Sequence, residues 1–137
     1  MTLAEKQQSL IEDLNLIPDP QERLSLLMVR SGISTLTADE KSDAYLVRGC
    51  VSSVWVTATP KGDTLEFRCD AESPMVKGLV SLLCELYSGA TPEEILSVET
   101  TIWEECGFLK MLSPTRLNGL SAVRERIRQL AMHTIFS

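Results

Sequence analysis

The sequence predicts an α+β fold in which five or six helices pack against a small, three-stranded antiparallel sheet. Capping residues stand directly before proline at four places, a pattern typical of helix starts because the cap accepts a backbone N–H and proline presets the first helical φ angle. Near the middle of the chain the apolar spacing changes from that of helices to the alternation of strands. The four capped prolines are Asp19-Pro20, Ser73-Pro74, Thr91-Pro92 and Ser113-Pro114.

Two helices are expected at the start of the chain. The first runs from about Leu3 to Leu16, and the second begins at Pro20 and ends near Gly32. Both carry apolar residues at helical spacing along one face, as a helix packed on a core requires. The polar stretch over residues 34–44 predicts a loop with one helical turn at Ala38–Ser42.

Three strands are expected next, arranged as an antiparallel meander. Thr64–Asp70 alternates between apolar and charged residues, which is typical of a half-buried strand. Ser52–Thr59 is rich in valine, threonine and tryptophan, and residues 60–63 supply the turn between the two. Tyr45–Arg48 is expected to be a short preceding strand, so that residues 49 and 50 fall in the first connection.

The remaining helices follow the strands. Pro74–Tyr87 is apolar nearly all round and is therefore expected to be the central buried helix. Pro92–Leu96 predicts a short helix, and Trp103–Cys106 another turn or two. Pro114–His133 predicts a long final helix with an apolar inner stripe.

Composition and charge narrow the classes of function. The 137 residues suit one domain, residues 1–137, with 44% hydrophobic and 23% charged residues. The start of the sequence lacks the pattern of a signal peptide, and no apolar run reaches the roughly 18 residues of a membrane helix, so we expect a soluble, cytoplasmic protein. The net charge of −6 disfavours nucleic acid as a partner. Arg124, Arg126 and Arg128 are typical of a solvated helix face.

The cysteines and the histidine do not form a familiar catalytic or metal-binding pattern. The four cysteines stand at positions 50, 69, 84 and 106, without a CxxC pair, and the single histidine is His133. These residues do not supply an ordinary zinc site, and we expect no metal. Hydrolysis by a cysteine nucleophile is also disfavoured, because only His133, near the end of the sequence, could act as its base.

Cys50 differs from the other cysteines in its neighbours. Cys69 falls on the inward side of a strand and Cys84 in the most apolar helix, while Cys106 follows two glutamates that oppose a thiolate. Cys50 follows a glycine in a strand connection, two positions after Arg48, which favours an accessible, partly ionised sulfur. These residues leave open a reactive thiol or a cysteine packed under the sheet edge. With no resolving cysteine nearby in the sequence, a reactive Cys50 suits a one-thiol carrier better than disulfide exchange.

Three segments resemble the SufE family of sulfur-acceptor proteins, in order and along nearly the whole chain. They are Gly49-Cys50 with Ser52 and Val54-Trp55, then Val76-Lys77-Gly78-Leu79, and then Leu112 to Leu120. The resemblance implies a SufE/IscU-like fold, with a small antiparallel sheet covered by helices on one side. It also implies a role, in which a cysteine desulfurase of the SufS/CsdA type releases sulfur as an enzyme-bound persulfide that the acceptor protein takes onto its own cysteine.

Carried over by position, the resemblance makes Cys50 the persulfide acceptor. Arg48, Gly49 and Ser52 are then expected to support its loop. The sulfur would pass to an iron-sulfur scaffold complex, and the protein would stimulate the desulfurase. The chain is expected to need no cofactor, since the pyridoxal phosphate belongs to the partner. A homodimer is left open.

Two residues stand out from their surroundings. The family commonly has glutamine directly after the acceptor cysteine, whereas this chain has Val51, which puts the positioning of the loop and the choice of partner in doubt. Arg116 occupies the first turn of a predicted helix, where a cation is unfavourable because the helix N-terminus is already positive. We interpret it as a contact for the partner or as a buried structural ion pair.

Sulfur carriage also predicts how the Cys50 loop behaves. A bound persulfide must be shielded from reductants and oxidants, and Val47, Val51 and Val54 are the expected apolar shelter. We therefore expect Cys50 to turn inward in the free protein and to extend when the desulfurase binds. The alternatives are a regulatory adaptor that carries no sulfur, a carrier for a pathway other than cluster assembly, and a metal-binding scaffold, which lacks ligands near Cys50.

Overall fold

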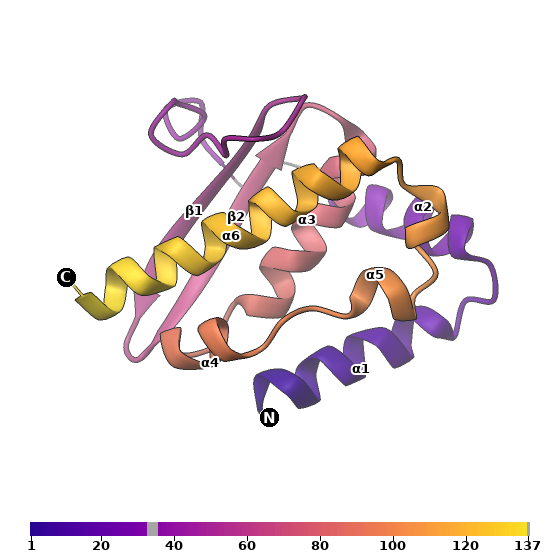
Figure 1. The fold of residues 1–137 in the computed structure, drawn as a ribbon, viewed down its shortest axis with the longest axis horizontal. Coiled ribbons are helices and arrows are strands. Elements are labelled where there is room, and N and C mark those ends of the chain that lie inside the picture. The colour runs from indigo at the N-terminus through magenta and orange to yellow at the C-terminus, as the bar shows by residue number, and fades with distance from the viewer. Residues whose placement is uncertain (33–35, 137) are drawn as a thin grey trace.

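An antiparallel pair of strands and the helix packed on it form the centre of the molecule (Figure 1). The computed structural model describes residues 1–32 and 36–136. β1 (Val54–Lys61) and β2 (Thr64–Ala71) pair in a register that runs from Val54 opposite Ala71 to Lys61 opposite Thr64. Gly62, with φ 61°, makes the tight turn between them. The predicted turn was too long, because Pro60 and Lys61 belong to β1.

The predicted third strand is wrong, since the described residues form a sheet of two strands. The segment 45–48 does run antiparallel to β1, but Leu46 and Trp55 form only an isolated bridge. Two backbone hydrogen bonds hold this bridge, from Val47 N to Val54 O and from Val56 N to Tyr45 O. Turns directly before residue 46 and the loop that starts at residue 48 limit the pairing to these few residues.

α3 (Pro74–Tyr87) is the central buried helix, as its all-round apolar sequence predicts. Ser73 caps it, and its inner side chains, among them Leu79, Val80 and Leu83, have almost no exposed surface. It packs against both β2 and α2. A Cβ at Gly78 would lie 3.2 Å from backbone atoms of Leu27 and Met28, so a glycine lets the two helices approach closely.

The N-terminal helices pack beside α3. α1 (Leu3–Asn15) begins at a capping box of Thr2 and Glu5, and α2 (Pro20–Arg30) begins at the Asp19 cap. Within the predicted loop 34–44, residues 34 and 35 lie outside the described residues. The rest contains hydrogen-bonded turns in place of the expected helical turn. Two ion pairs fasten this segment to β2, Glu40 to Arg68 and Lys41 to the buried Asp70.

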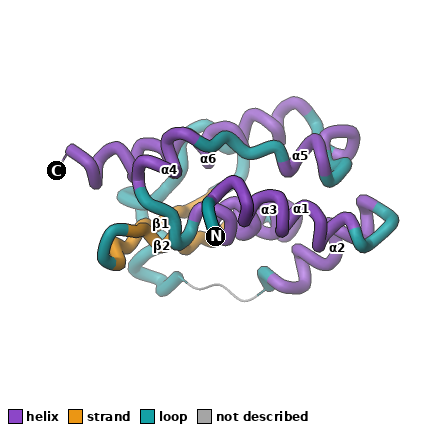
Figure 2. Tube along the Cα trace, turned by 90° about the horizontal axis from the view of Figure 1, so that it is seen from below, coloured by secondary structure: helices purple, strands orange, loops and turns teal. Residues whose placement is uncertain are grey.

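Three helices in the second half of the chain cover another side of α1 and α3 (Figure 2). They are α4 (Pro92–Ser97), α5 (Ile102–Glu105) and α6 (Pro114–Phe136). A 3₁₀ helix at Leu109–Met111, which the sequence did not predict, leads into α6. α6 packs against β1, α3 and α4, and its C-terminal end projects past the sheet (Figure 1). No helix in the described residues combines the length and apolar character needed to cross a membrane.

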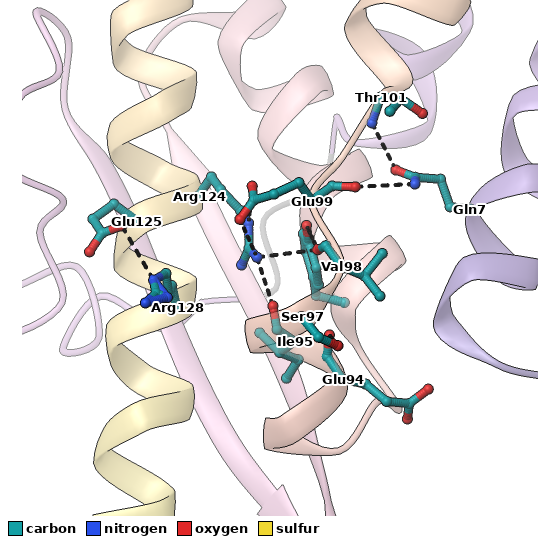
Figure 3. Close-up of polar contacts among 11 residues, drawn as sticks. Gln7, Glu94, Ile95, Ser97, Val98, Glu99, Thr101, Arg124, Glu125 and Arg128 are labelled. Carbon is teal, nitrogen blue, oxygen red and sulfur yellow. Dashed lines mark hydrogen bonds and ion pairs between the residues drawn. The ribbon is translucent and has the colours of Figure 1, made fainter.

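Arg124 holds α6 to the segment around α4 (Figure 3). Its side chain is buried, donates to the carbonyl oxygens of Ile95 and Val98, and forms an ion pair with Glu99 at 3.1 Å. Its guanidinium also lies 4.4 Å from the centre of the Tyr87 ring. Arg124 was predicted to lie on a solvated helix face, but it has a structural role. Carbonyl oxygens and an aromatic ring replace water as the contacts of its guanidinium.

Candidate functional site

Cys50 lies in the loop between the Leu46 bridge and β1, where a glycine fixes the path of the backbone. Gly49 adopts φ 96°, a conformation that side chains disfavour. A Cβ at this position would also lie 3.2 Å from the Cβ of Ala122 on α6. Gly49 therefore lets the loop turn sharply while it touches α6, which brings the neighbouring Cys50 to that helix.

The Cys50 thiol is half-buried and donates to α6. Its Sγ lies 3.5 Å from the carbonyl oxygen of Gly119. A Cβ at Gly119 would stand 3.7 Å from the same sulfur. Burial raises the pKa of the Cys50 thiol, so the protonated form is favoured in this position. The loop is thus in an inward position that holds a neutral thiol.

A cavity of about 300 Å³ opens beside the Cys50 sulfur. A water molecule occupies about 30 Å³ in the liquid, so the cavity has room for an added sulfur atom. Its lining combines apolar side chains with several hydroxyl groups and one arginine. The lining residues are Cys50, Val51, Ser52, Ser73, Val76, Ser113, Thr115, Arg116, Gly119 and Leu120.

Two helix N-termini converge on this cavity. The Ser73 hydroxyl accepts from Val76 N in the first turn of α3, and the Ser113 hydroxyl accepts from Arg116 N in the first turn of α6. Helix N-termini carry partial positive charge, which favours an anion beside them. The Arg116 side chain reaches across and donates to the Ser73 hydroxyl at 3.4 Å, which adds a full positive charge. The helix N-termini and Arg116 therefore favour an anion in the cavity, while burial keeps the Cys50 thiol itself protonated.

The structure separates the two arginines that the sequence singled out. Arg116 is half-buried in the Cys50 cavity and forms no ion pair within the described residues. Arg48, although two positions from Cys50, is exposed and lines a different hollow together with Arg126 on α6. The thiol is not held ionised by Arg48 in this position, because burial determines the direction of its pKa shift.

The apolar shelter differs in part from the one expected. Val47 and Val54 are buried, but Val51 is 86% exposed. The side chains that cover Cys50 on the cavity side are Val76 and Leu120, from α3 and α6. Because the loop turns Cys50 inward, its neighbour Val51 points outward at the loop surface.

The other three cysteines lie in the core. Cys69, Cys84 and Cys106 are 7%, 4% and 0% exposed. Burial raises the pKa of Cys106 to about 11, so this thiol stays protonated at neutral pH. Within the described residues no group of three or more histidine, cysteine, aspartate or glutamate side chains is placed to hold a metal ion.

Several residues of the site were not predicted as such. Ser73 and Ser113 were assigned only as helix caps, and Val76 and Leu120 as apolar helix residues within the family-like segments. Their convergence depends on how α3 and α6 pack, which local sequence does not reveal. The three segments that resemble a known family, around Cys50, Val76 and Arg116, meet at this one cavity.

Comparison with known proteins identifies the family. The family model described as "Fe-S metabolism associated domain", SufE, matches residues 8–131, which is nearly the whole chain. The chain belongs to the SufE family. An uncharacterized SufE-like protein of Synechocystis sp. is 32% identical over 119 residues, covering 86% of this chain and 75% of the relative. Another, from Rhizobium etli, is 28% identical over 128 residues, covering 89% and 86%.

A solved structure shares the fold of this chain. The solution structure of a hypothetical protein from Thermus thermophilus matches with a TM-score of 0.77 at 23% identity, covering 96% of this chain and 97% of that one. The likeness confirms an α+β fold. Membership of the SufE family associates the chain with iron-sulfur metabolism and, in general terms, with sulfur transfer from a cysteine desulfurase.

Proposed function

We propose that this protein accepts persulfide sulfur from a cysteine desulfurase on Cys50, passes it to iron-sulfur cluster assembly, and stimulates the desulfurase. One observation carries the proposal. Of the four cysteines, Cys50 alone lies in a loop and is only half-buried, and it has a cavity with room for an added sulfur atom beside it. The other three are buried in strands, helices or helix ends of the core. The partner would be a desulfurase of the SufS/CsdA type, and the recipient an iron-sulfur scaffold complex.

The proposed transfer moves one sulfur atom without net oxidation. The Cys50 thiolate attacks the outer sulfur of the donor's persulfide, so a new S–S bond forms on Cys50 while the donor's S–S bond breaks. The donor cysteine leaves as a thiolate and takes up the proton that Cys50 lost. The reaction repeats in the opposite sense when Cys50 hands its sulfur to the next thiol.

The inward position is unsuited to attack and suited to storage. The thiol is protonated there, donates to the Gly119 carbonyl oxygen, and is covered by α3 and α6. Attack requires the loop to extend, which exposes the sulfur to water and to the donor's site and lowers its pKa. On return, the helix N-termini and Arg116 would stabilise a persulfide anion inside the cavity.

Turnover of the desulfurase with matched variants tests the proposal. Alanine formation from cysteine is measured with the wild-type protein, with Cys50→Ser and with Cys106→Ser, the last being a control that also removes one thiol. We expect stimulation by the wild type and by Cys106→Ser, and loss of stimulation by Cys50→Ser. Full stimulation by Cys50→Ser would overturn the carrier role and leave an adaptor that acts by binding alone.

The destination of the sulfur needs a separate measurement. Sulfur-loaded protein, freed from desulfurase, is mixed with an iron-sulfur scaffold complex and ferrous iron, and cluster formation is followed by its absorbance. We expect cluster formation that depends on Cys50. Loaded protein that gives up no sulfur to the scaffold would show that the carrier serves another pathway.

A further inference from the structure

The fold brings together two cysteines from different elements, in a cavity separate from that of Cys50. Cys69 lies on the inward face of β2, and its Sγ is 3.6 Å from the Ser81 hydroxyl on α3. Cys84 lies three residues after Ser81, on the same face of that helix. Cys69 and Cys84 both line the cavity between these two elements. Two thiols thus meet across the packed interface between a strand and a helix.

A cavity gives small molecules access to this pair. It has a volume of about 280 Å³, and its lining includes Cys69, Cys84 and Ser81. Its rim carries the ion pair of Arg30 with Glu85, both of which are exposed, so the cavity reaches the surface. The Cys50 cavity is a separate one, with no lining residue in common.

The surroundings of the two thiols favour different chemical roles for them. The interaction between the two thiols lowers the pKa of Cys69 and raises that of Cys84. Lys77, which also lines the cavity, is paired with Asp70 beside Cys69 at 3.2 Å. The thiol that ionises more readily reacts first with an electrophile, and the protonated neighbour then serves as the resolving group.

We propose that Cys69 and Cys84 form a redox-responsive pair that closes to a disulfide when a hydroperoxide enters the cavity between β2 and α3. The proposal goes beyond sulfur carriage and does not depend on it. The Cys69 thiolate attacks the peroxide O–O bond and becomes a sulfenic acid, while the peroxide leaves as an alcohol or water. The Cys84 sulfur then attacks the sulfenic sulfur, and water departs with the proton of Cys84. The two sulfurs are each oxidised by one electron, and the peroxide is reduced by two.

The disulfide would join two elements that already pack together. It would tie β2 to α3, the helix whose first turn lines the Cys50 cavity. Because the two thiols are already neighbours, the disulfide can form by rotation of the two side chains within packed elements. This agrees with the short distance that a disulfide can span. A cross-link between segments separated in sequence restricts the unfolded chain, so the oxidised protein is expected to unfold at a higher temperature.

Peptide mapping after peroxide treatment tests the pair. Cys50→Ser protein, used so that the loop cysteine cannot cross-link molecules, is treated with hydrogen peroxide, unfolded in N-ethylmaleimide and digested. We expect a peptide joined through Cys69 and Cys84, an intact mass lower by two hydrogens, and a raised unfolding temperature, all reversed by dithiothreitol. Recovery of both cysteines as their N-ethylmaleimide adducts, or of Cys69 carrying added oxygen without a cross-link, would overturn the proposal.

Matched variants separate the pair from general oxidation. In the same background, Cys106→Ser removes a buried cysteine outside this cavity and is expected to keep the cross-link. Cys69→Ser and Cys84→Ala are expected to lose the cross-link and the rise in unfolding temperature. If either substitution prevents folding, the mapping of the Cys50→Ser protein alone decides the outcome. A cross-link that persists in Cys69→Ser would contradict the assignment.

Discussion

The Sγ of Cys50 donates to the carbonyl oxygen of Gly119 across 3.5 Å, which joins the loop before β1 to the second turn of α6. Gly119 is buried, and within the described part of the chain a Cβ there would meet only this sulfur within 4 Å, apart from its own helix and chain neighbours. The pair thus sets how deeply the thiol enters its cavity. Changes at Gly119 act on Cys50 without touching the loop itself.

A graded series at Gly119 is expected to move the thiol. In Gly119→Ala the added Cβ would meet the sulfur at 3.7 Å, an ordinary contact, so we expect a near-normal site and a helix stabilised by about 1 kcal/mol. In Gly119→Val the further methyl groups displace the sulfur towards solvent, and alkylation of Cys50 by iodoacetamide is expected to speed up several-fold. Asn118→Val places a valine at the neighbouring position and serves as the control for a valine in this turn of α6. An unchanged alkylation rate in Gly119→Val would show that the contact does not retain the thiol.

Arg116 is expected to matter for transfer more than for folding. Arg116→Gln removes the charge that lines the cavity but leaves a polar side chain, and the lost hydrogen bond to Ser73 is worth about 1 kcal/mol of stability. We expect the equilibrium of sulfur loading to shift about tenfold back towards the desulfurase, because the persulfide anion in the cavity loses the charge that stabilises it. A tenfold shift corresponds to about 1.4 kcal/mol. Urea unfolding and the extent of single-turnover loading measure the two effects. Arg48→Gln removes a charge from the other hollow and is the control for charge near the loop. An equal loss of sulfur loading in Arg48→Gln would show that Arg116 has no special role.

The helix starts could be predicted because their causes are local. Ser73-Pro74 and Thr91-Pro92 each hold both the capping side chain and the fixed φ angle within two residues, and both begin helices where expected. The third strand failed because pairing depends on distant backbone, and the chain beside Trp55 turns away after one bridge.

Only the central residue of the candidate site, Cys50, could be predicted from the sequence. Cys50 could be found from its glycine neighbour and the family resemblance. Arg48 was chosen because it is close in sequence, yet it faces another hollow, while Arg116 reaches the cavity from α6. The meeting of Cys69 with Cys84 had no sequence indication either, because it depends on how β2 packs on α3.

The buried thiol of Cys106 is expected to make stability fall in alkaline solution. Its pKa rises from the ordinary 9.0 to about 11 in the fold because burial disfavours the thiolate. The unfolded chain therefore loses this proton first, and the free energy of unfolding declines as the pH rises from 9 to 11. Two pKa units correspond to about 2.7 kcal/mol.

Urea unfolding at several pH values compares the wild type with Cys106→Ala to isolate this effect. The free energy of unfolding of Cys106→Ala starts lower, because the substitution leaves a cavity in the core. It is expected to decline less steeply than that of the wild type between pH 9 and pH 11. Tyr87, whose pKa burial raises to about 12, is present in both proteins and contributes equally. Parallel curves would contradict the assignment to Cys106.

Arg124 and Glu99 form an ion pair whose two members are expected to differ in importance. Arg124 is buried and donates to two carbonyl oxygens, whereas the Glu99 side chain is 69% exposed. Arg124→Ala leaves those acceptors buried without their donor, and we expect a loss of about 2–4 kcal/mol. Glu99→Gln is expected to cost about 1 kcal/mol or less, because an exposed partner contributes little. Urea unfolding of both variants checks the contrast, and equal losses would point to the ion pair itself as the main stabilising contact.

The mass of the protein after reaction with a cysteine desulfurase and cysteine tests sulfur acceptance most directly. Intact-mass measurement followed by peptide mapping under non-reducing conditions locates any added sulfur. We expect one or more sulfur atoms on the peptide that contains Cys50, absent in Cys50→Ser and unchanged in Cys106→Ser. Sulfur found on Cys69, Cys84 or Cys106, or no added mass while the desulfurase turns over, would contradict the account.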